Sequence, residues 1–229
     1  MRLLLTSGGV TNSSIRAVLV DMLGKPVEDC DARFIPTAQW GQPMCSPQSV
    51  WRSTTGGEPN GRGLIELGWK SIGVLELTAL PSIAPTRWIP WVRKADALLV
   101  DGGEAIYLAH WMQQSGLADQ LPSLTDTVWV GVSAGSMVMT PRVGRQFLDW
   151  NPEGGDEALG AVGFSIFPHL DYPGWSSNTS ESAHRWAAGI AGPAYAIDDQ
   201  TAISVVDGTV KVVSEGSWHQ FPQETEQDR

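Results

Sequence analysis

The sequence predicts an α/β fold in which a mainly parallel central sheet is flanked by helices. Short, continuous apolar runs recur along the chain, each closed by a glycine or a small polar residue, which is typical of strands buried on both faces. Segments with helical apolar spacing alternate with these runs, and strand–helix–strand repetition implies right-handed crossovers between parallel strands. The chain of 229 residues shows neither an internal repeat nor a clear linker, so we expect a single domain over residues 1–229.

Strands of the central sheet are predicted at Arg2–Thr6, Arg33–Thr37, Ser71–Leu77, Ala97–Val100 and Val128–Val132. After the first strand, Asn12 or Ser13 is suited to cap a helix that runs to about Leu23 and stops at Gly24. Later helices are predicted at Pro85–Lys94, at Ala105–Gln114, with Gly116 after its end, and from Ala134 to about Thr140.

Two regions depart from this alternation. Residues 41–68 are rich in Gly, Pro, Ser and Thr and predict a long loop with one short helix, either a functional lid or a plain insertion. After residue 160, short strands are predicted at Ala194–Ile197, Ala202–Val206, Val210–Val213 and Trp218–Phe221. Asp207-Gly208 and Glu215-Gly216 separate them and predict hairpin turns, so we expect C-terminal antiparallel hairpins at the sheet edge. Residues 222–229 are polar and predict a frayed end.

The charge balance argues against a nucleic-acid partner. Lys plus Arg is 15 and Asp plus Glu is 25, a net charge of −10 without a basic run, whereas phosphate binding needs clustered cations. Anionic membrane surfaces are unfavourable for the same reason. No apolar stretch reaches the roughly 18 residues of a spanning helix. The first apolar run is also too short for a signal peptide, so we expect a cytoplasmic protein with no membrane partner.

Cys30 and Cys45 are too few for a disulfide scaffold and are not in CxxC spacing. We interpret both as ordinary thiols and expect neither a metal nor an organic cofactor. The expected partner is a small peptide substrate. The sequence leaves the oligomeric state open, a homodimer included.

The segment Gly131-Val132-Ser133-Ala134-Gly135 is a GxSxG pattern between a predicted strand and a predicted helix. A serine on so sharp a turn projects its Oγ away from the backbone, and the flanking glycines let the chain turn without clashes. The backbone N–H of Ala134 then lies at a helix N-terminus, where unpaired donors favour a developing oxyanion. We interpret Ser133 as a candidate nucleophile; the alternative is a tight turn with an unreactive serine.

A serine nucleophile needs a base. The chain has four histidines, which are His110, His169, His184 and His219. His110 falls inside a predicted helix, His184 in an exposed helical turn and His219 in a terminal strand. His169 follows an apolar strand and a proline, at the strand end where parallel sheets carry their functional loops. Position therefore favours His169, although a lone histidine is more often structural.

A carboxylate must hold the imidazole in its working tautomer. The sequence does not choose among the candidates, which are Asp149, Asp171, Asp198 and Asp199, and each of them also suits a cap or a turn. A second oxyanion donor is suggested by Gly102 and Gly103, because glycines that end a buried strand let a backbone N–H face the site.

In this order along the chain, several segments resemble the peptidase E (aspartyl dipeptidase) and cyanophycinase family: Val100-Asp-Gly-Gly-Glu, Gly131-Val-Ser-Ala-Gly-Ser, Pro168-His169 and Ile197-Asp-Asp-Gln-Thr-Ala-Ile. The resemblance covers nearly the whole chain. It implies the flavodoxin-like fold of class I glutamine amidotransferases, with serine in place of cysteine at the nucleophile elbow. It also implies that Ser133 is the nucleophile and His169 the base, and that Gly102 or Gly103, together with Ala134, supplies the oxyanion N–H groups.

The family commonly has a glutamate where this chain has Asp199, so the resemblance implies Asp199 as the acid, with Asp149 as the fallback. This chain has Asp101-Gly-Gly-Glu104 where the family commonly has Gly-Gly-Gly-Asn. Dipeptidase members also place an arginine near the position of Ser182, to pair with the aspartate of the substrate. Arg185 lies about one helical turn from that position. We therefore consider Glu104 and Arg185 for substrate binding.

Together these features predict a serine-type, dipeptidase-like hydrolase of small peptides, which acts through Ser133, His169, Asp199 and an acyl-enzyme. The preference for aspartyl peptides stays open. An esterase of the α/β-hydrolase type would use the chain order Ser133, Asp199, His219. A third hypothesis is a non-catalytic amidotransferase-like domain that binds a metabolite or a partner.

Overall fold

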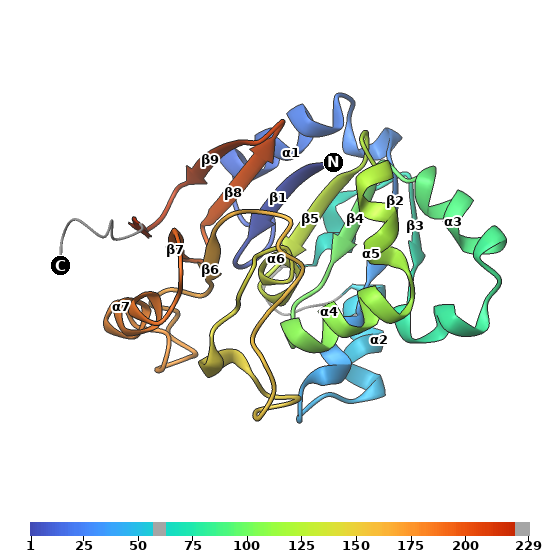
Figure 1. The fold of residues 1–229 in the computed structure, drawn as a ribbon. Helices are drawn as coiled ribbons and strands as arrows, with labels where there is room; N and C mark the ends of the chain where they lie inside the picture. The colour runs from blue at the N-terminus through green and yellow to red at the C-terminus, as the bar shows by residue number, and fades with distance from the viewer. Residues whose placement is uncertain (57–62, 223–229) are drawn as a thin grey trace.

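The computed structural model describes residues 1–56 and 63–222, whose strands form a seven-stranded and a three-stranded sheet (Figure 1). The larger sheet has the order β3-β2-β4-β5-β1-β8-β9. Its parallel strands are β1 (Arg2–Thr6), β2 (Asp31–Ile35), β3 (Ser71–Val74), β4 (Ala97–Val100) and β5 (Val128–Val132). β8 (Thr201–Val206) and β9 (Thr209–Ser214) continue the sheet in antiparallel pairing. The α/β fold with a mainly parallel sheet is thus confirmed.

Alternate residues of the parallel strands enter two separate apolar cores, which is why these strands are apolar throughout. Leu3 and Leu5 pack on one face of the sheet with α4 (Ala105–Gln114) and α5 (Leu117–Gln120), whereas Leu4 packs on the other face with α1 (Ser13–Leu23). Burying such a side chain contributes about 2 kcal/mol. In register, Thr6 lies beside Val132, so the carboxyl ends of β1 and β5 reach the same edge of the sheet.

The α-helices of the described residues are α1 (Ser13–Leu23), α2 (Pro47–Thr55), α3 (Pro85–Arg93), α4 (Ala105–Gln114), α5 (Leu117–Gln120), α6 (Ala134–Met137) and α7 (Ser180–Ala188). Short 3-10 turns are η1 (Val27–Asp29), η2 (Thr37–Gly41), η3 (Leu64–Leu67), η4 (Leu77–Ser82), η5 (Leu121–Ser123) and η6 (Arg145–Phe147). The predicted ends of the first helix are confirmed: Asn12 accepts the N–H of Ile15, and Gly24 adopts φ 69°. Within the described ranges, no helix combines the length and apolar character needed to cross a membrane.

Some predicted boundaries are wrong for physical reasons. β2 ends before Pro36, which has no N–H to continue the ladder. β3 ends at Val74 and is an edge strand, with Ile72 37% and Val74 50% exposed, so it is not buried on both faces. In the described part of region 41–68, the expected short helix is α2, and the 3-10 turn η3 follows it. Residues 57–62 of that region, and 223–229 of the predicted frayed end, lie outside the described residues.

The C-terminal turns differ from each other. Asp207 and Gly208 both have positive φ (49° and 76°) and join β8 to β9, so this hairpin is confirmed. Glu215-Gly216 instead carries the chain out of the large sheet. It leads to β10 (Trp218–Phe221), which pairs antiparallel with β7 (Ala194–Ile197) beside β6 (Ser165–Phe167) in the small sheet. Asp198 organises this passage by accepting the N–H of Ser217 at 2.5 Å.

The small sheet and α7 enclose a third apolar cluster, which contains Phe167, Trp186 and Ala196. Figure 1 shows these elements at the end of the molecule where β8 and β9 lie, away from β3. They matter for function because the chain emerges from β6 into Pro168 and His169, beside the carboxyl ends of the parallel strands.

Candidate active site

A cavity of about 980 Å³ brings the candidate residues together. Its volume is at the upper end of the usual range for ligand sites. Ser133, His169, Gly102 and Gly103 line it, so segments far apart in sequence share one wall. Further walls come from Gln39, residues 42–45, α2 and Leu64, and from Gln146, Phe147, Asp149, Trp175, Ser177, Asn178, Ser182 and Arg185.

Ser133 occupies the sharp turn between β5 and α6. Its backbone has φ 49° and ψ −111°, a conformation that costs a non-glycine residue about 1–3 kcal/mol. The flanking glycines are sterically required: a Cβ on Gly131 would lie 2.3 Å from the carbonyl oxygen of Gly135, and one on Gly135 would lie 2.2 Å from that of Val100. The GxSxG spacing therefore follows from close packing of the turn against β4 and β5.

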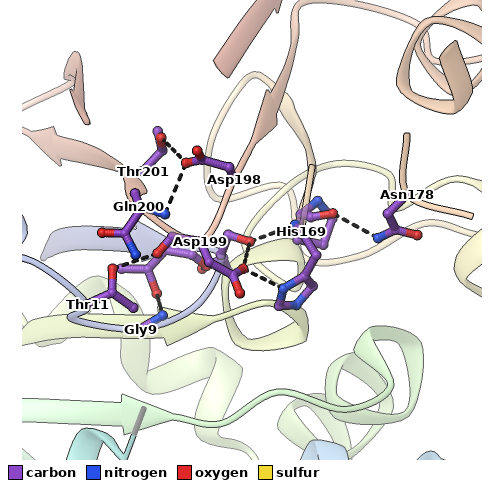
Figure 2. Close-up of polar contacts among 12 residues, drawn as sticks. Gly9, Thr11, His169, Asn178, Asp198, Asp199, Gln200 and Thr201 are labelled. Carbon is purple, nitrogen blue, oxygen red and sulfur yellow. Dashed lines mark hydrogen bonds and ion pairs between the residues drawn. The ribbon is translucent and has the colours of Figure 1, made fainter. Parts of the chain in front are cut away.

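His169 follows β6 and carries a carboxylate partner. Its Nδ1 is 2.6 Å from Oδ1 of Asp199, and the two side chains are only 6% and 11% exposed (Figure 2). An ionised carboxylate can only accept, so Nδ1 carries the shared proton and Nε2 is left as an acceptor. Nε2 is buried, and no described residue bonds to it. A ring in this state can take up a proton delivered from the cavity.

Asp199 is one methylene shorter than the glutamate that the family commonly has at this position. It still reaches the His169 ring because the backbone of Gly8 approaches it closely. A Cβ on Gly8 would lie 2.7 Å from both Cβ and Cγ of Asp199, so only glycine leaves room there. Thr11 donates its hydroxyl to the backbone carbonyl of Asp199 at 2.6 Å. Ser7 donates its hydroxyl to Oδ1 of Asp199 at 2.9 Å. The loop after β1 thus holds both the backbone and the carboxylate of Asp199.

The loop after β4 lies against Ser133. A Cβ built on Gly102 would be 3.5 Å from Cβ of Ser133, and one on Gly103 would meet the backbone of Ala38 at 2.3 Å. The N–H of Gly102 donates to Oδ1 of Asp101 at 2.8 Å and is therefore already engaged. Asp101 also accepts from Gln39, whose amide donates to Ser53 of α2 at 2.6 Å. This network links the glycine loop to the helix that forms part of the cavity wall.

Glu104 is buried in the interior and is not among the residues that line the cavity. Its side chain is buried, with 1% of the residue exposed, and it accepts the N–H of Tyr107 at 2.5 Å as the N-cap of α4. Burial raises the pKa of Glu104. The prediction that Glu104 contacts substrate is therefore wrong, because capping the helix turns the carboxylate into the interior.

Arg185 does line the cavity. It stands on α7, donates to Ser182 Oγ at 3.0 Å and forms an ion pair with Glu181, while 64% of its side chain remains exposed. Among the described lining residues, no other lysine or arginine is present.

The remaining candidates take other places. Asp149 lines the cavity, but within the described chain the carboxylate bonded to the His169 ring is that of Asp199. Asp171 accepts the N–H of Ser180, the first residue of α7, at 2.9 Å. Asp198 accepts from Thr201 Oγ1 at 2.6 Å in the adjoining turn (Figure 2).

The other histidines lie away from the described cavity wall. His184 and His219 face each other on α7 and β10, with ring centroids 5.9 Å apart. His110 packs against Trp111 and Trp150. Position along the chain had already favoured His169 over these three.

Sequence reasoning missed three contributors to this site. Ser7 and Gly8 belong to the Thr-Ser-Gly-Gly segment that ends β1, which carries no recognisable catalytic pattern. Trp175 packs edge-on against His169, with ring centroids 4.3 Å apart, and lines the cavity while 47% exposed. The only available signal was that all three follow strand ends or neighbour His169. Among the described residues, no group of three or more His, Cys, Asp or Glu is arranged to hold a metal ion.

A serine on a strained strand-to-helix turn and a carboxylate-paired histidine, both at one cavity above a parallel sheet, define a hydrolase-like site on a flavodoxin-like α/β fold. Comparison with known families gives the narrower identity. The model of Peptidase family S51 matches residues 3–213, and the chain belongs to this family. The resemblance to peptidase E proteins is thereby confirmed.

Solved structures agree with this assignment at the level of the fold. A candidate peptidase E protein from Listeria monocytogenes EGD-e is 18% identical, with a TM-score of 0.68, over 94% of this chain and 98% of that one. A peptidase from an acI-B1 Actinobacterium is 19% identical, with a TM-score of 0.66, over 98% of this chain and 95% of that one. No curated protein matches the chain.

Proposed function

We propose that this chain is a serine peptidase that hydrolyses small peptides through Ser133, His169 and Asp199. The observation that carries the proposal is the state of the His169 ring. Its Nδ1 is bonded to Asp199, its Nε2 is buried without a described partner, and it lines the same cavity as Ser133. A base held in this tautomer is what a serine nucleophile requires.

In the proposed reaction, Oγ of Ser133 attacks the scissile carbonyl carbon while Nε2 of His169 takes the hydroxyl proton. The N–H groups of Gly103 and Ala134 hold the oxyanion; Gly102 is left out because its N–H is bonded to Asp101. Collapse breaks the peptide bond, and His169 returns the proton to the departing amine. Water then attacks the acyl-enzyme with His169 again as the base, which releases the acid and restores Ser133.

The proposed substrate class rests on Arg185. Arg185 is a planar cation at the cavity, suited to bidentate recognition of a carboxylate. We propose that it binds a substrate carboxylate, which makes short acidic peptides, aspartyl dipeptides among them, the first substrates to try. Arg185→Met should then raise KM for such peptides while changing kcat little. An equal KM in both proteins would remove Arg185 from the proposal.

The activity is tested by intact-protein mass spectrometry after treatment with an alkyl fluorophosphonate, which reacts with activated serines. We expect one adduct in the wild type, no adduct in Ser133→Ala, and normal labelling in Ser177→Ala, which removes another hydroxyl from the cavity wall. Absence of labelling in folded protein, or an adduct that survives Ser133→Ala, would count against the proposal.

Two variants and a substrate panel separate the alternatives. An esterase of the α/β-hydrolase type depends on His219, so His219→Ala would abolish its activity and His169→Ala would not. The peptidase proposal expects the reverse. Dipeptides, isoaspartyl peptides and simple esters form the panel, and serine-dependent turnover of any of them excludes a purely binding role.

A further inference from the structure

Ser7 is buried at the end of β1 and has no part in the chemistry proposed above. It is 0% exposed and is not among the residues that line the cavity. Its hydroxyl nevertheless makes two contacts with the candidate machinery. It donates to Oδ1 of Asp199 at 2.9 Å and accepts the backbone N–H of His169 at 2.6 Å. One hydroxyl therefore touches both members of the His169–Asp199 pair.

The backbone contact matters because His169 is held in an unusual conformation. Its φ is 57°, in the left-handed region that non-glycine residues seldom adopt, and such a conformation persists only where the surroundings fix it. Neighbouring bonds brace the segment: Asn178 donates to the carbonyl of Pro168 at 3.0 Å, and Leu170 donates to that of Ile197 at 3.1 Å. Ser7 supplies the contact to the N–H of His169 itself.

Thr6, the residue before Ser7, holds the turn that carries Ser133. The carbonyl of Thr6 accepts the N–H of Ser133 at 3.0 Å and the hydroxyl of Ser136 at 2.8 Å. Thr6 thus fixes the turn that carries Ser133, and Ser7 fixes the loop that carries His169. Thr6, the last residue of β1, and Ser7, which follows it, therefore set the spacing between Ser133 and His169.

We propose that Ser7 is a positioning residue for the hydrolytic reaction, one that sets the place of the His169 ring and of Asp199 relative to Ser133. This inference rests on the proposed function. Ser7 acts through hydrogen bonds to the base and the carboxylate and touches no substrate. Its removal therefore lowers the reactivity of Ser133 and leaves the cavity wall unchanged.

The test compares rates of Ser133 labelling by an alkyl fluorophosphonate, measured by intact mass on protein shown to be folded by circular dichroism. Ser7→Ala should react about 10- to 100-fold more slowly, the range expected for losing a hydrogen bond to a charged group. The matched control is Ser165→Ala, which removes an equally buried hydroxyl whose 2.7 Å bond goes to the carbonyl of Arg142. That variant should label at the wild-type rate. Ser7→Thr, which keeps the hydroxyl, should recover most of the lost rate.

The outcomes separate this inference from the proposed function. If the wild type is not labelled at Ser133, the proposed function fails. If the wild type is labelled and Ser7→Ala labels within two-fold of it, the positioning role is overturned. A loss in Ser165→Ala as large as that in Ser7→Ala, or a folded Ser7→Thr as slow as Ser7→Ala, overturns it as well, because the effect would then be general destabilisation or unrelated to the hydroxyl.

Discussion

Gly8→Ala should disconnect Asp199 from His169 without altering any titratable group. The added Cβ would lie 2.7 Å from Cβ and Cγ of Asp199, whereas carbon atoms in contact prefer about 3.5–4.0 Å. One of the two must move by roughly 1 Å. Rotation of the Asp199 side chain moves Cγ but leaves Cβ in place, so the backbone at Gly8 or at Asp199 must shift. The 2.6 Å contact of Asp199 with Nδ1 is then lost. A displacement of this size in a catalytic group costs on the order of 100-fold in rate.

The assay is again the rate of fluorophosphonate labelling at Ser133, together with thermal unfolding. Overpacking of this kind costs about 1–3 kcal/mol of stability, so both measurements should change. Gly163→Ala is the matched control, because a Cβ there meets no heavy atom within 4 Å. Equal labelling rates in Gly8→Ala and Gly163→Ala would rule out this effect, since Asp199 would then either tolerate the clash or be irrelevant to the reaction.

Other consequences follow from the same geometry. Asp199→Asn should lower turnover by about 10³- to 10⁴-fold by upsetting the tautomer of His169, whereas Asp149→Asn should lower it only a few-fold. If the two variants lose kcat/KM to a similar extent, Asp199 is not the carboxylate that orients His169. Gly135→Ala should lower Tm by several degrees, because its Cβ would lie 2.2 Å from the carbonyl oxygen of Val100, and an unchanged Tm would contradict the packing described for the turn. Burial raises the pKa of Glu104, so the folded state binds its proton more tightly, and the stability this provides is full below about pH 4.3 and declines as pH rises through the folded-state pKa. The Tm of the wild type relative to Glu104→Gln should therefore fall between pH 4 and pH 8, and a pH-independent difference would show that Glu104 does not titrate in this way.

The sequence was informative wherever one segment decides its own structure. β1, β4, β5 and α4 form over the predicted residues, because apolar runs and caps act locally. The pattern around Ser133 was readable for the same reason, since the glycines on each side answer a clash within a single turn and its neighbouring strands. His169 was favoured by its position after a strand, which parallel topology alone brings to the functional edge.

Features that depend on which segments become neighbours were not predictable. The exposure of β3 follows from its place at the sheet edge, and its composition did not reveal that place. The carboxylate that pairs with His169 is selected by the close approach of Gly8, more than 190 positions before Asp199 in the chain. Two missed details are local instead: Glu104 caps the first turn of its own helix, and the N–H of Gly102 bonds to the adjacent Asp101.

A crystal structure of the fluorophosphonate-treated protein would show the nucleophile, the oxyanion donors and the base in one experiment. We expect phosphorus bonded to Oγ of Ser133, the phosphoryl oxygen within hydrogen-bond distance of the N–H groups of Gly103 and Ala134, and Nε2 of His169 beside the adduct. Phosphorus on another residue, or an adduct on Ser133 whose phosphoryl oxygen meets neither N–H and whose surroundings exclude His169, would contradict the proposed reaction.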